Sequence, residues 1–200
     1  MDPSSIPDTR PLYDRALAQL RAIAASAAPE RLDAPTPCTE WTVRELLGHT
    51  LTVADRLAAM AEGAEPPPFD AIATAPGDDF AAAFADRAER VRATWADDAV
   101  LDRTFTLPFG DWNGRASIAV AASDACMHAW DAARALGQST EGLDAELAEL
   151  AREVVGALAP PESRTEEHVP FDPVREAPEG ADTYTRLAAW MGRDPEWAAA

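Results

Sequence analysis

Cysteine is scarce in this sequence, which contains only Cys38 and Cys126 among its 200 residues. Two cysteines cannot form the multiple-disulfide framework that holds many small secreted domains together, although they could still pair once. Basic residues are also few, with 17 of them against 35 acidic residues and a net charge of −18. A field of this sign repels phosphate backbones and anionic lipid surfaces, which argues against nucleic acid and membranes as partners.

Long apolar runs are missing as well. No stretch of the sequence reaches the roughly 20 apolar residues that a membrane-spanning helix needs. Residues 1–8 lack the basic start and the apolar core of a signal peptide. Together with the expectation of reduced thiols, these absences predict a cytoplasmic protein. No internal repeat is visible, and a chain of 200 residues suits one domain with its own core.

Helical patterning, by contrast, is abundant. Hydrophobic residues make up 47% of the chain, and many of them are alanine, the best helix former. Apolar residues recur every three or four positions in four long segments. We expect these segments to be helices over about residues 8–28, 42–62, 78–95 and 115–136, with shorter helices over 144–158 and 182–191. The sequence Thr42-Val-Arg-Glu45 is a capping box that marks the start of the second helix.

The segments between the helices carry loop signals. Prolines mark residues 34–40 and 66–76 as loops, and residues 162–180 are polar and irregular. Apolar residues alternate over 100–114, where Gly110-Asp111 and Asn113-Gly114 offer turn chemistry, so a short β-hairpin or extended excursion is expected. The whole predicts an all-α, up-down antiparallel four-helix bundle with the remaining helices outside it. Residues 1–200 form one domain in this interpretation, and 162–200 are a C-terminal extension that packs on the bundle.

The three histidines are His49, His128 and His168. His49 lies in the middle of the second helix, between apolar residues of its inner face, so it should point into the bundle. On the fourth helix, Asp124, His128 and Asp131 stand in one column because they are spaced by four and three residues. His168 lies in the polar segment and is expected to be exposed.

This spacing predicts a metal site between helices. Asp124 and His128 can chelate one ion, and His49 would complete a three-ligand site. Such a set leaves a coordination position open for water or substrate and suits catalytic zinc, with nickel or iron as alternatives. Two interpretations stay open from the residues alone. The histidines could instead be hydrogen-bonded core residues, and Asp131 could either face solvent or orient an imidazole.

Other reactive side chains are weaker candidates. Cys126 is about 200° around the helix from Asp124 and His128, so we expect a small buried apolar residue rather than a ligand. Cys38 lies in a loop and has no basic neighbour in the local sequence to lower its pKa. Arg44 could grip an anionic substrate or serve only as a surface residue.

Two motifs resemble those of a known family. The stretch Cys38-Thr-Glu-Trp41-Thr-Val-Arg-Glu-Leu-Leu-Gly-His49 resembles the N-terminal signature of the mycothiol-dependent maleylpyruvate isomerase family. That family belongs to the DinB-like superfamily of metal-binding four-helix bundles. The stretch Asp124-Ala-Cys-Met-His128-Ala-Trp130-Asp131 resembles its second pattern. Residues 186–195 resemble endings seen in one branch of these proteins.

The resemblance implies a divalent metal, often zinc, held at positions 49, 124 and 128, and a low-molecular-weight thiol such as mycothiol as cosubstrate. Asp124 stands where the family usually has a glutamate, which shortens the reach by one methylene, and Thr39-Glu40 stand where Pro-Gly is common. We therefore expect a metal-dependent thiol transferase or isomerase that acts on a small molecule. The alternative is a non-catalytic bundle protein that binds a metal or ligand. A homodimer is compatible with both.

Overall fold

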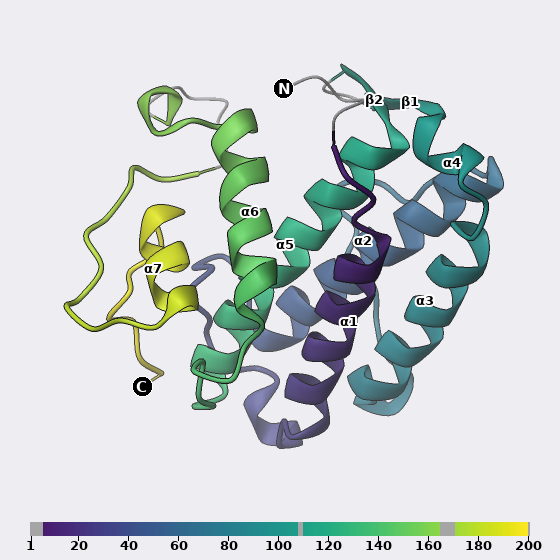
Figure 1. Cartoon of the computed structure of the whole chain (residues 1–200). Coiled ribbons are helices and arrows are strands. Elements are labelled where there is room, and N and C mark those ends of the chain that lie inside the picture. The colour runs from purple at the N-terminus through teal and green to yellow at the C-terminus, as the bar shows by residue number, and fades with distance from the viewer. Residues whose placement is uncertain (1–5, 108–109, 165–170, 200) are drawn as a thin grey trace.

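Four long helices form the body of the molecule. The computed structural model describes residues 6–107, 110–164 and 171–199. The long helices are α1 (Arg10–Ala25), α2 (Val43–Glu62), α3 (Phe80–Thr94) and α5 (Gly114–Ala135). α1 packs against α3 and α5, and α2 packs against the same two helices, which closes the bundle (Figure 1). The predicted all-α four-helix bundle with a short hairpin is confirmed.

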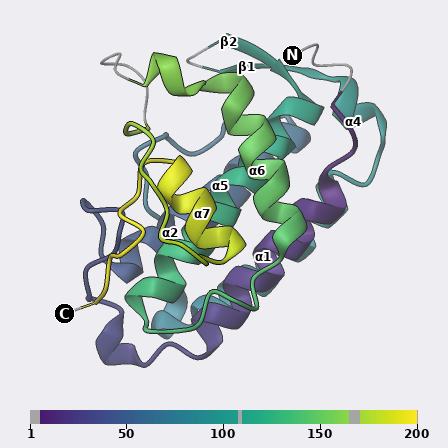
Figure 2. The same ribbon diagram turned by 60° about the vertical axis from the view of Figure 1, so that its left-hand side comes forward.

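The shorter elements lie on one side and at the ends of this bundle. α6 (Ala145–Leu158) packs on α5, and α7 (Thr183–Trp190) packs on both, as the turned view in Figure 2 shows. α4 (Ala99–Asp102) precedes an antiparallel pair of strands, β1 (Thr104–Leu107) and β2 (Gly110–Asn113). Three single 3₁₀ turns complete the described elements: η2 (Pro29–Arg31), η3 (Pro76–Asp78) and η4 (Pro161–Ser163).

The core runs through the bundle and is apolar. Its largest fully buried side chains include Trp95, Trp130, Tyr13, Tyr184 and Phe84. These residues come from α1, α3, α5 and α7 or lie directly after them, so α7 belongs to the packed structure. Across the described ranges, no helix has both the length and the apolar character that crossing a bilayer requires.

One detail of the helix order differs from a strictly alternating antiparallel arrangement. α2 and α3 run in the same direction, because the linker between them returns along α2 (Figure 1). Near the start of α2, the Ala73 amide donates to the Gly48 carbonyl at 3.2 Å and to the Thr52 hydroxyl at 2.9 Å. Directly after α3, the Trp95 indole donates to the Leu57 carbonyl at 2.9 Å. The proline-rich linker is therefore a crossover that covers one side of α2.

Gly48 permits this return, because a Cβ there would lie 2.3 Å from the Ala73 carbonyl oxygen and 2.7 Å from Ile72 Cγ2. We expect Gly48→Ala to displace the linker and to lower the free energy of unfolding by about 1–3 kcal/mol, measured by chemical denaturation. Gly156→Ala in α6 is the matched control, because its Cβ would meet only the Trp190 ring, at 3.6 Å. That change should be neutral or stabilise by up to about 1 kcal/mol. Equal effects of the two substitutions would contradict this role of the linker.

The hairpin lies in the region expected to be extended. The residues predicted to form its turns, however, lie in a strand or at the start of α5. Gly110 and Asp111 belong to β2, and the residues between the strands, 108–109, lie outside the described residues. Asn113 caps α5 by accepting a hydrogen bond from the Ala116 amide at 3.0 Å. Gly114 is the first residue of that helix. A side chain at this position would clash with α4, so a glycine is required. The start of the predicted extended region is helical, as α4.

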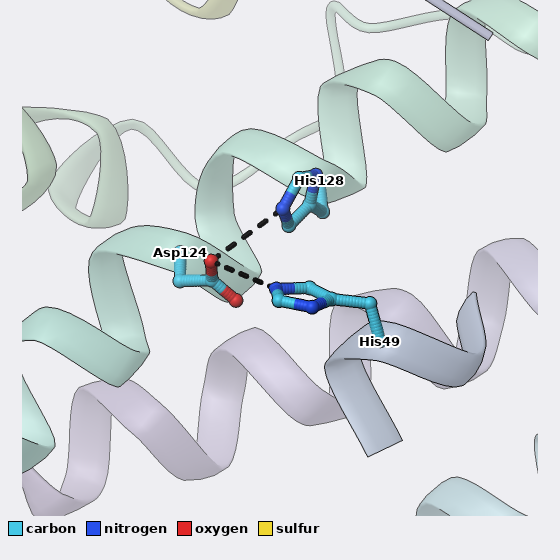
Figure 3. A group of neighbouring side chains, drawn as sticks. All are labelled: His49, Asp124 and His128. Carbon is cyan, nitrogen blue, oxygen red and sulfur yellow. Dashed lines mark hydrogen bonds and ion pairs between the residues drawn. The ribbon is translucent and has the colours of Figure 1, made fainter. Parts of the chain in front are cut away.

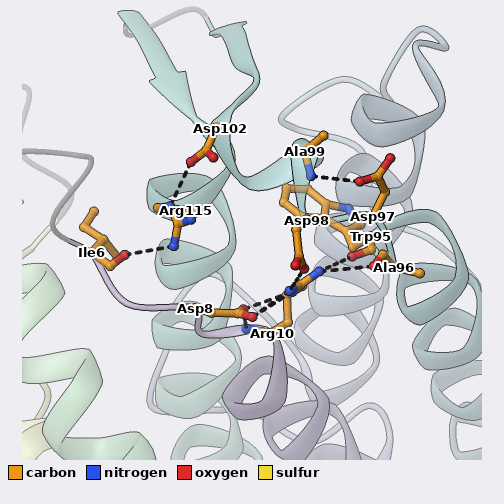
Figure 4. A network of polar contacts seen from close by, with 10 residues as sticks. All are labelled: Ile6, Asp8, Arg10, Trp95, Ala96, Asp97, Asp98, Ala99, Asp102 and Arg115. Carbon is orange, nitrogen blue, oxygen red and sulfur yellow. Dashed lines mark hydrogen bonds and ion pairs between the residues drawn. The ribbon is translucent and has the colours of Figure 1, made fainter.

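Arginines tie the N-terminal segment to the end of the bundle that carries the hairpin (Figure 4). Arg10 donates from Nε to Asp8 at 3.0 Å, from Nη1 to the Trp95 carbonyl at 2.8 Å, and from Nη2 to Asp98 at 2.5 Å. Arg115, in the first turn of α5, pairs with an aspartate of α4 at 3.0 Å. These contacts hold the ends of α1, α3, α4 and α5 together.

Candidate metal centre

The start of α2 determines where His49 lies. The Thr42 hydroxyl accepts from the Glu45 amide at 3.3 Å, and the Glu45 carboxylate accepts from the Thr42 amide at 2.8 Å. This pair is the predicted capping box, and it starts the helix at Val43. His49 therefore stands in the second turn of α2, on the side that faces α5 (Figure 3).

The loop before α2 places the side chain of Trp41 against the two imidazoles. The Thr36 hydroxyl accepts from the Cys38 amide at 3.1 Å and lies 2.9 Å from the Trp41 carbonyl oxygen, so the loop is held by its own hydrogen bonds. The Trp41 ring lies 4.5 Å from the His49 ring and 5.6 Å from the His128 ring, between centroids. One side of the centre is thereby covered by an aromatic side chain.

His49, Asp124 and His128 converge on one point between α2 and α5 (Figure 3). Asp124 Oδ1 lies 3.3 Å from His49 Nε2 and 3.5 Å from His128 Nε2. One nitrogen or oxygen from each of the three residues lies within 4.8 Å of the others. The His128 side chain is only 8% exposed, whereas 17% of His49 and 28% of Asp124 are exposed, so solvent reaches the centre past these two. The structure thus brings the three predicted ligands together.

The arrangement fits a divalent ion. Two ligand atoms that are each about 2.0 Å from a tetrahedral zinc ion lie about 3.3 Å apart, which is close to the separations between Asp124 Oδ1 and the two imidazole nitrogens. Asp124 Oδ2 is enclosed and has no hydrogen-bond partner within the described part of the chain. A buried carboxylate oxygen without a partner is costly unless an ion or a water pairs with it. Two imidazoles and one carboxylate are also a donor set that zinc prefers.

Asp131 holds His128 in the orientation that the centre needs. Its side chain is fully buried, and its Oδ2 accepts from His128 Nδ1 at 3.0 Å. Nδ1 carries the proton in this hydrogen bond, and the opposite nitrogen, Nε2, faces Asp124. Of the two interpretations of Asp131 from sequence, the structure supports the orienting contact and excludes the solvent-facing one.

Arg193 is a residue of the centre that the sequence did not reveal. It follows α7, and it donates from Nε to Asp131 Oδ1 at 3.2 Å and from Nη2 to Asp131 Oδ2 at 3.3 Å. The C-terminal segment therefore reaches the side chain that orients His128. The only sequence signal was the family-like ending over 186–195, which gave no role to this arginine.

The charged side chains of the centre shift one another's pKa values. Burial by itself raises the pKa of Asp124, but the neighbouring His128 and His49 outweigh it and hold that pKa well below its usual range. Burial lowers the pKa of His128, whereas the carboxylates of Asp124 and Asp131 raise it to about 9. At neutral pH the metal-free protein therefore carries an imidazolium at position 128, between two carboxylates.

The remaining candidates lie outside this group. Cys126 is fully buried, as expected for a small apolar residue, and burial raises the pKa of its thiol to about 12. Burial also raises the pKa of the Cys38 thiol to about 11, although Arg193 opposes the shift. Arg44 pairs with two aspartates at the surface. His168 lies outside the described residues.

Comparison with known proteins agrees with the two histidine motifs. Residues 13–133 match a family described as the mycothiol maleylpyruvate isomerase N-terminal domain, and this range includes His49, Asp124 and His128. Two uncharacterized proteins of Mycobacterium tuberculosis, from strains CDC 1551 / Oshkosh and ATCC 25618 / H37Rv, are each 32% identical over 181 residues, which covers 90% of this chain and 95% of the relative. The similarity therefore extends well beyond the matched domain. The chain belongs to the mycothiol maleylpyruvate isomerase N-terminal domain family.

Proposed function

We propose that this protein binds one divalent metal ion through His49, Asp124 and His128 and uses it in thiol transfer to, or isomerisation of, a small molecule. The observation that carries the proposal is the convergence of two imidazole nitrogens on one carboxylate whose second oxygen is buried without a partner. Zinc suits the donor set, with nickel or iron as alternatives. Membership of the family supports a mycothiol-type thiol as cosubstrate.

Each residue of the centre has a definite task in this proposal. A zinc ion held there would lower the pKa of a coordinated water or thiol and polarise a carbonyl group. Asp131 keeps the proton of His128 on Nδ1, so that Nε2 is free to ligate. Arg193 fixes the Asp131 carboxylate, and Trp41 excludes water from one side of the imidazoles. Three protein ligands leave a position for water, thiol or substrate.

A turnover assay separates this proposal from its alternative, a bundle that binds a metal or ligand without catalysis. The zinc-loaded chain is incubated with mycothiol and a set of unsaturated or halogenated electrophiles, maleylpyruvate included, and loss of free thiol and of substrate is followed. We expect zinc-dependent turnover that Asp124→Ala abolishes and that His168→Ala leaves intact. A chain that keeps its zinc and shows no turnover with any member of the set would favour the non-catalytic alternative.

Zinc affinity should rise with pH. The pKa of His128 is raised from 6.5 to about 9 in the metal-free protein, so a proton must leave this residue before the ion can bind. The apparent affinity should therefore increase by about tenfold per pH unit from pH 7 to pH 9 and then level off. Calorimetry at pH 7 in two buffers of different ionisation enthalpy should show about one proton released from His128 per ion. An affinity that does not change over this range would contradict the raised pKa.

A further inference from the structure

Arg56 occupies an unusual position beside the metal centre. It lies on α2 seven residues after His49, which places it two turns, or about 10 Å, along the same side of the helix. Helical side chains tilt toward the N-terminus, which is the direction of His49 from Arg56. It is only 8% exposed, and among the described arginines only Arg164 is also buried. Asp124 is the acidic group whose charge reaches it, raising the Arg56 pKa against the lowering by burial.

The guanidinium of Arg56 is held in place by neutral groups of the linker. Nε donates to the Pro67 carbonyl at 3.3 Å, and Nη2 donates to the Pro68 carbonyl at 2.8 Å. The group also lies over the Phe69 ring, 4.0 Å from its centroid. Its other terminal nitrogen, Nη1, makes no hydrogen bond to any described residue, and it is not among the polar atoms sealed from solvent. Nη1 of this fixed guanidinium is thus available to donate hydrogen bonds to a bound molecule.

Arg56 is one of nine arginines that form no ion pair within the described residues, against eight that do. Within the described residues, eight arginines form ion pairs with aspartate or glutamate: Arg10, Arg15, Arg44, Arg87, Arg90, Arg92, Arg115 and Arg193. Asp55, next to Arg56 in sequence, pairs with two of them from α3. In a chain with 35 acidic residues and only 17 basic ones, the two buried arginines, Arg56 and Arg164, both donate to backbone carbonyls and not to carboxylates of the described residues.

Metal binding would leave Arg56 without a compensating charge. Asp131 and Arg193 neutralise each other, and a divalent ion would more than neutralise Asp124, the acidic group that acts on Arg56. The loaded centre and Arg56 would together be locally positive in a protein whose net charge is −18. A fixed guanidinium in such a place binds a carboxylate through charge-assisted hydrogen bonds.

We infer that Arg56 is an anion subsite of the metal centre, which selects substrates that carry a carboxylate remote from the group bound at the ion. The inference rests on the proposed function and adds to it a class of substrate, small molecules with at least two polar ends of which one is anionic. Phe69 and the carbonyls of Pro67 and Pro68 are the parts of the linker that hold the guanidinium in position for this contact.

Calorimetry on the zinc-loaded full chain tests the subsite. The probes are malonate, succinate, glutarate and adipate, each compared with its monoamide, in which one carboxylate becomes neutral. At least one diacid should bind about tenfold more tightly than its monoamide. Arg56→Gln should remove that difference while leaving the zinc content unchanged, and Arg56→Lys should retain part of it.

Arg103→Gln is the matched control. Arg103 also donates to two backbone carbonyls, at the end of α2, and also lies near an aromatic ring, that of Phe105. This variant should keep the preference for the diacid. Equal affinities for every diacid and its monoamide in the unmodified protein, or a preference that survives in folded Arg56→Gln, would overturn the inference alone. A chain that binds no zinc would overturn the proposed function and the subsite together.

Discussion

Alanine in place of His128 should reduce the zinc affinity of the protein by more than about a hundredfold. Changes to residues that merely orient a ligand cost 10–100-fold, and loss of a ligand itself should exceed this. His128 is the most enclosed of the three candidate ligands, so water cannot readily take its place with the same geometry. The affinity is measured by competition with a chromophoric chelator, at pH 8.

Two further variants define the result. His49→Ala should have an effect of similar size, because its Nε2 lies 3.3 Å from the same carboxylate oxygen. His168→Ala removes the third histidine and should bind zinc as the unmodified chain does. Near-normal affinity in a folded His128→Ala protein would show that the ligand assignment is wrong, whatever the protein does with metals elsewhere.

Asp131→Asn should have the largest effect on stability. The substitution leaves the guanidinium of Arg193, whose side chain is 19% exposed, without its carboxylate. Removing one partner of a fully buried pair costs about 3–5 kcal/mol, and the partial exposure of Arg193 reduces this to about 2–4 kcal/mol. Zinc affinity should fall by about 10–100-fold as well, because His128 loses the charged acceptor of its Nδ1 proton. Chemical denaturation of the metal-free protein and chelator competition measure the two effects.

A surface pair provides the comparison for this prediction. Glu62 pairs with Arg90 at 2.7 Å, and both side chains are at least one-third exposed. Glu62→Gln should leave both the free energy of unfolding and the zinc affinity essentially unchanged, because solvent screens the pair. In a double-mutant cycle, Asp131→Asn combined with Arg193→Gln should destabilise less than the sum of the two single changes. Additive effects would mean that the two side chains do not act as a pair.

Local sequence rules predicted the helices that carry the three candidate ligands and the spacing of the ligands on them. The column of Asp124 and His128 follows from a spacing of four residues on a helix, and the capping box at Thr42 fixes the start of the helix that carries His49. The apolar periodicity of the long helices also indicates which side faces inward. Convergence of the three side chains on one point required the helices to pack in the observed order, which spacing alone does not give.

The residues that sequence did not assign depend on contacts between distant segments. Arg193 reaches Asp131 across 62 positions of the chain, and no local pattern indicates such a pairing. Arg56 follows an aspartate in the sequence and resembles an ordinary exposed charge until the linker is seen to cover it. Asn113 and Gly114 carry turn chemistry, but helix capping and the close approach of α4 compete for the same residue types. Here the tertiary structure decides between two local meanings.

The metal content of the untagged protein, measured by mass spectrometry after purification without chelators, tests the metal centre most directly. We expect about one ion per chain, most often zinc, and the same stoichiometry after the stripped protein is reloaded with zinc and passed through a desalting column. A protein that holds no zinc, nickel or iron after reloading would contradict this expectation, and the polar cluster of His49, Asp124 and His128 would then be a hydrogen-bonded part of the core.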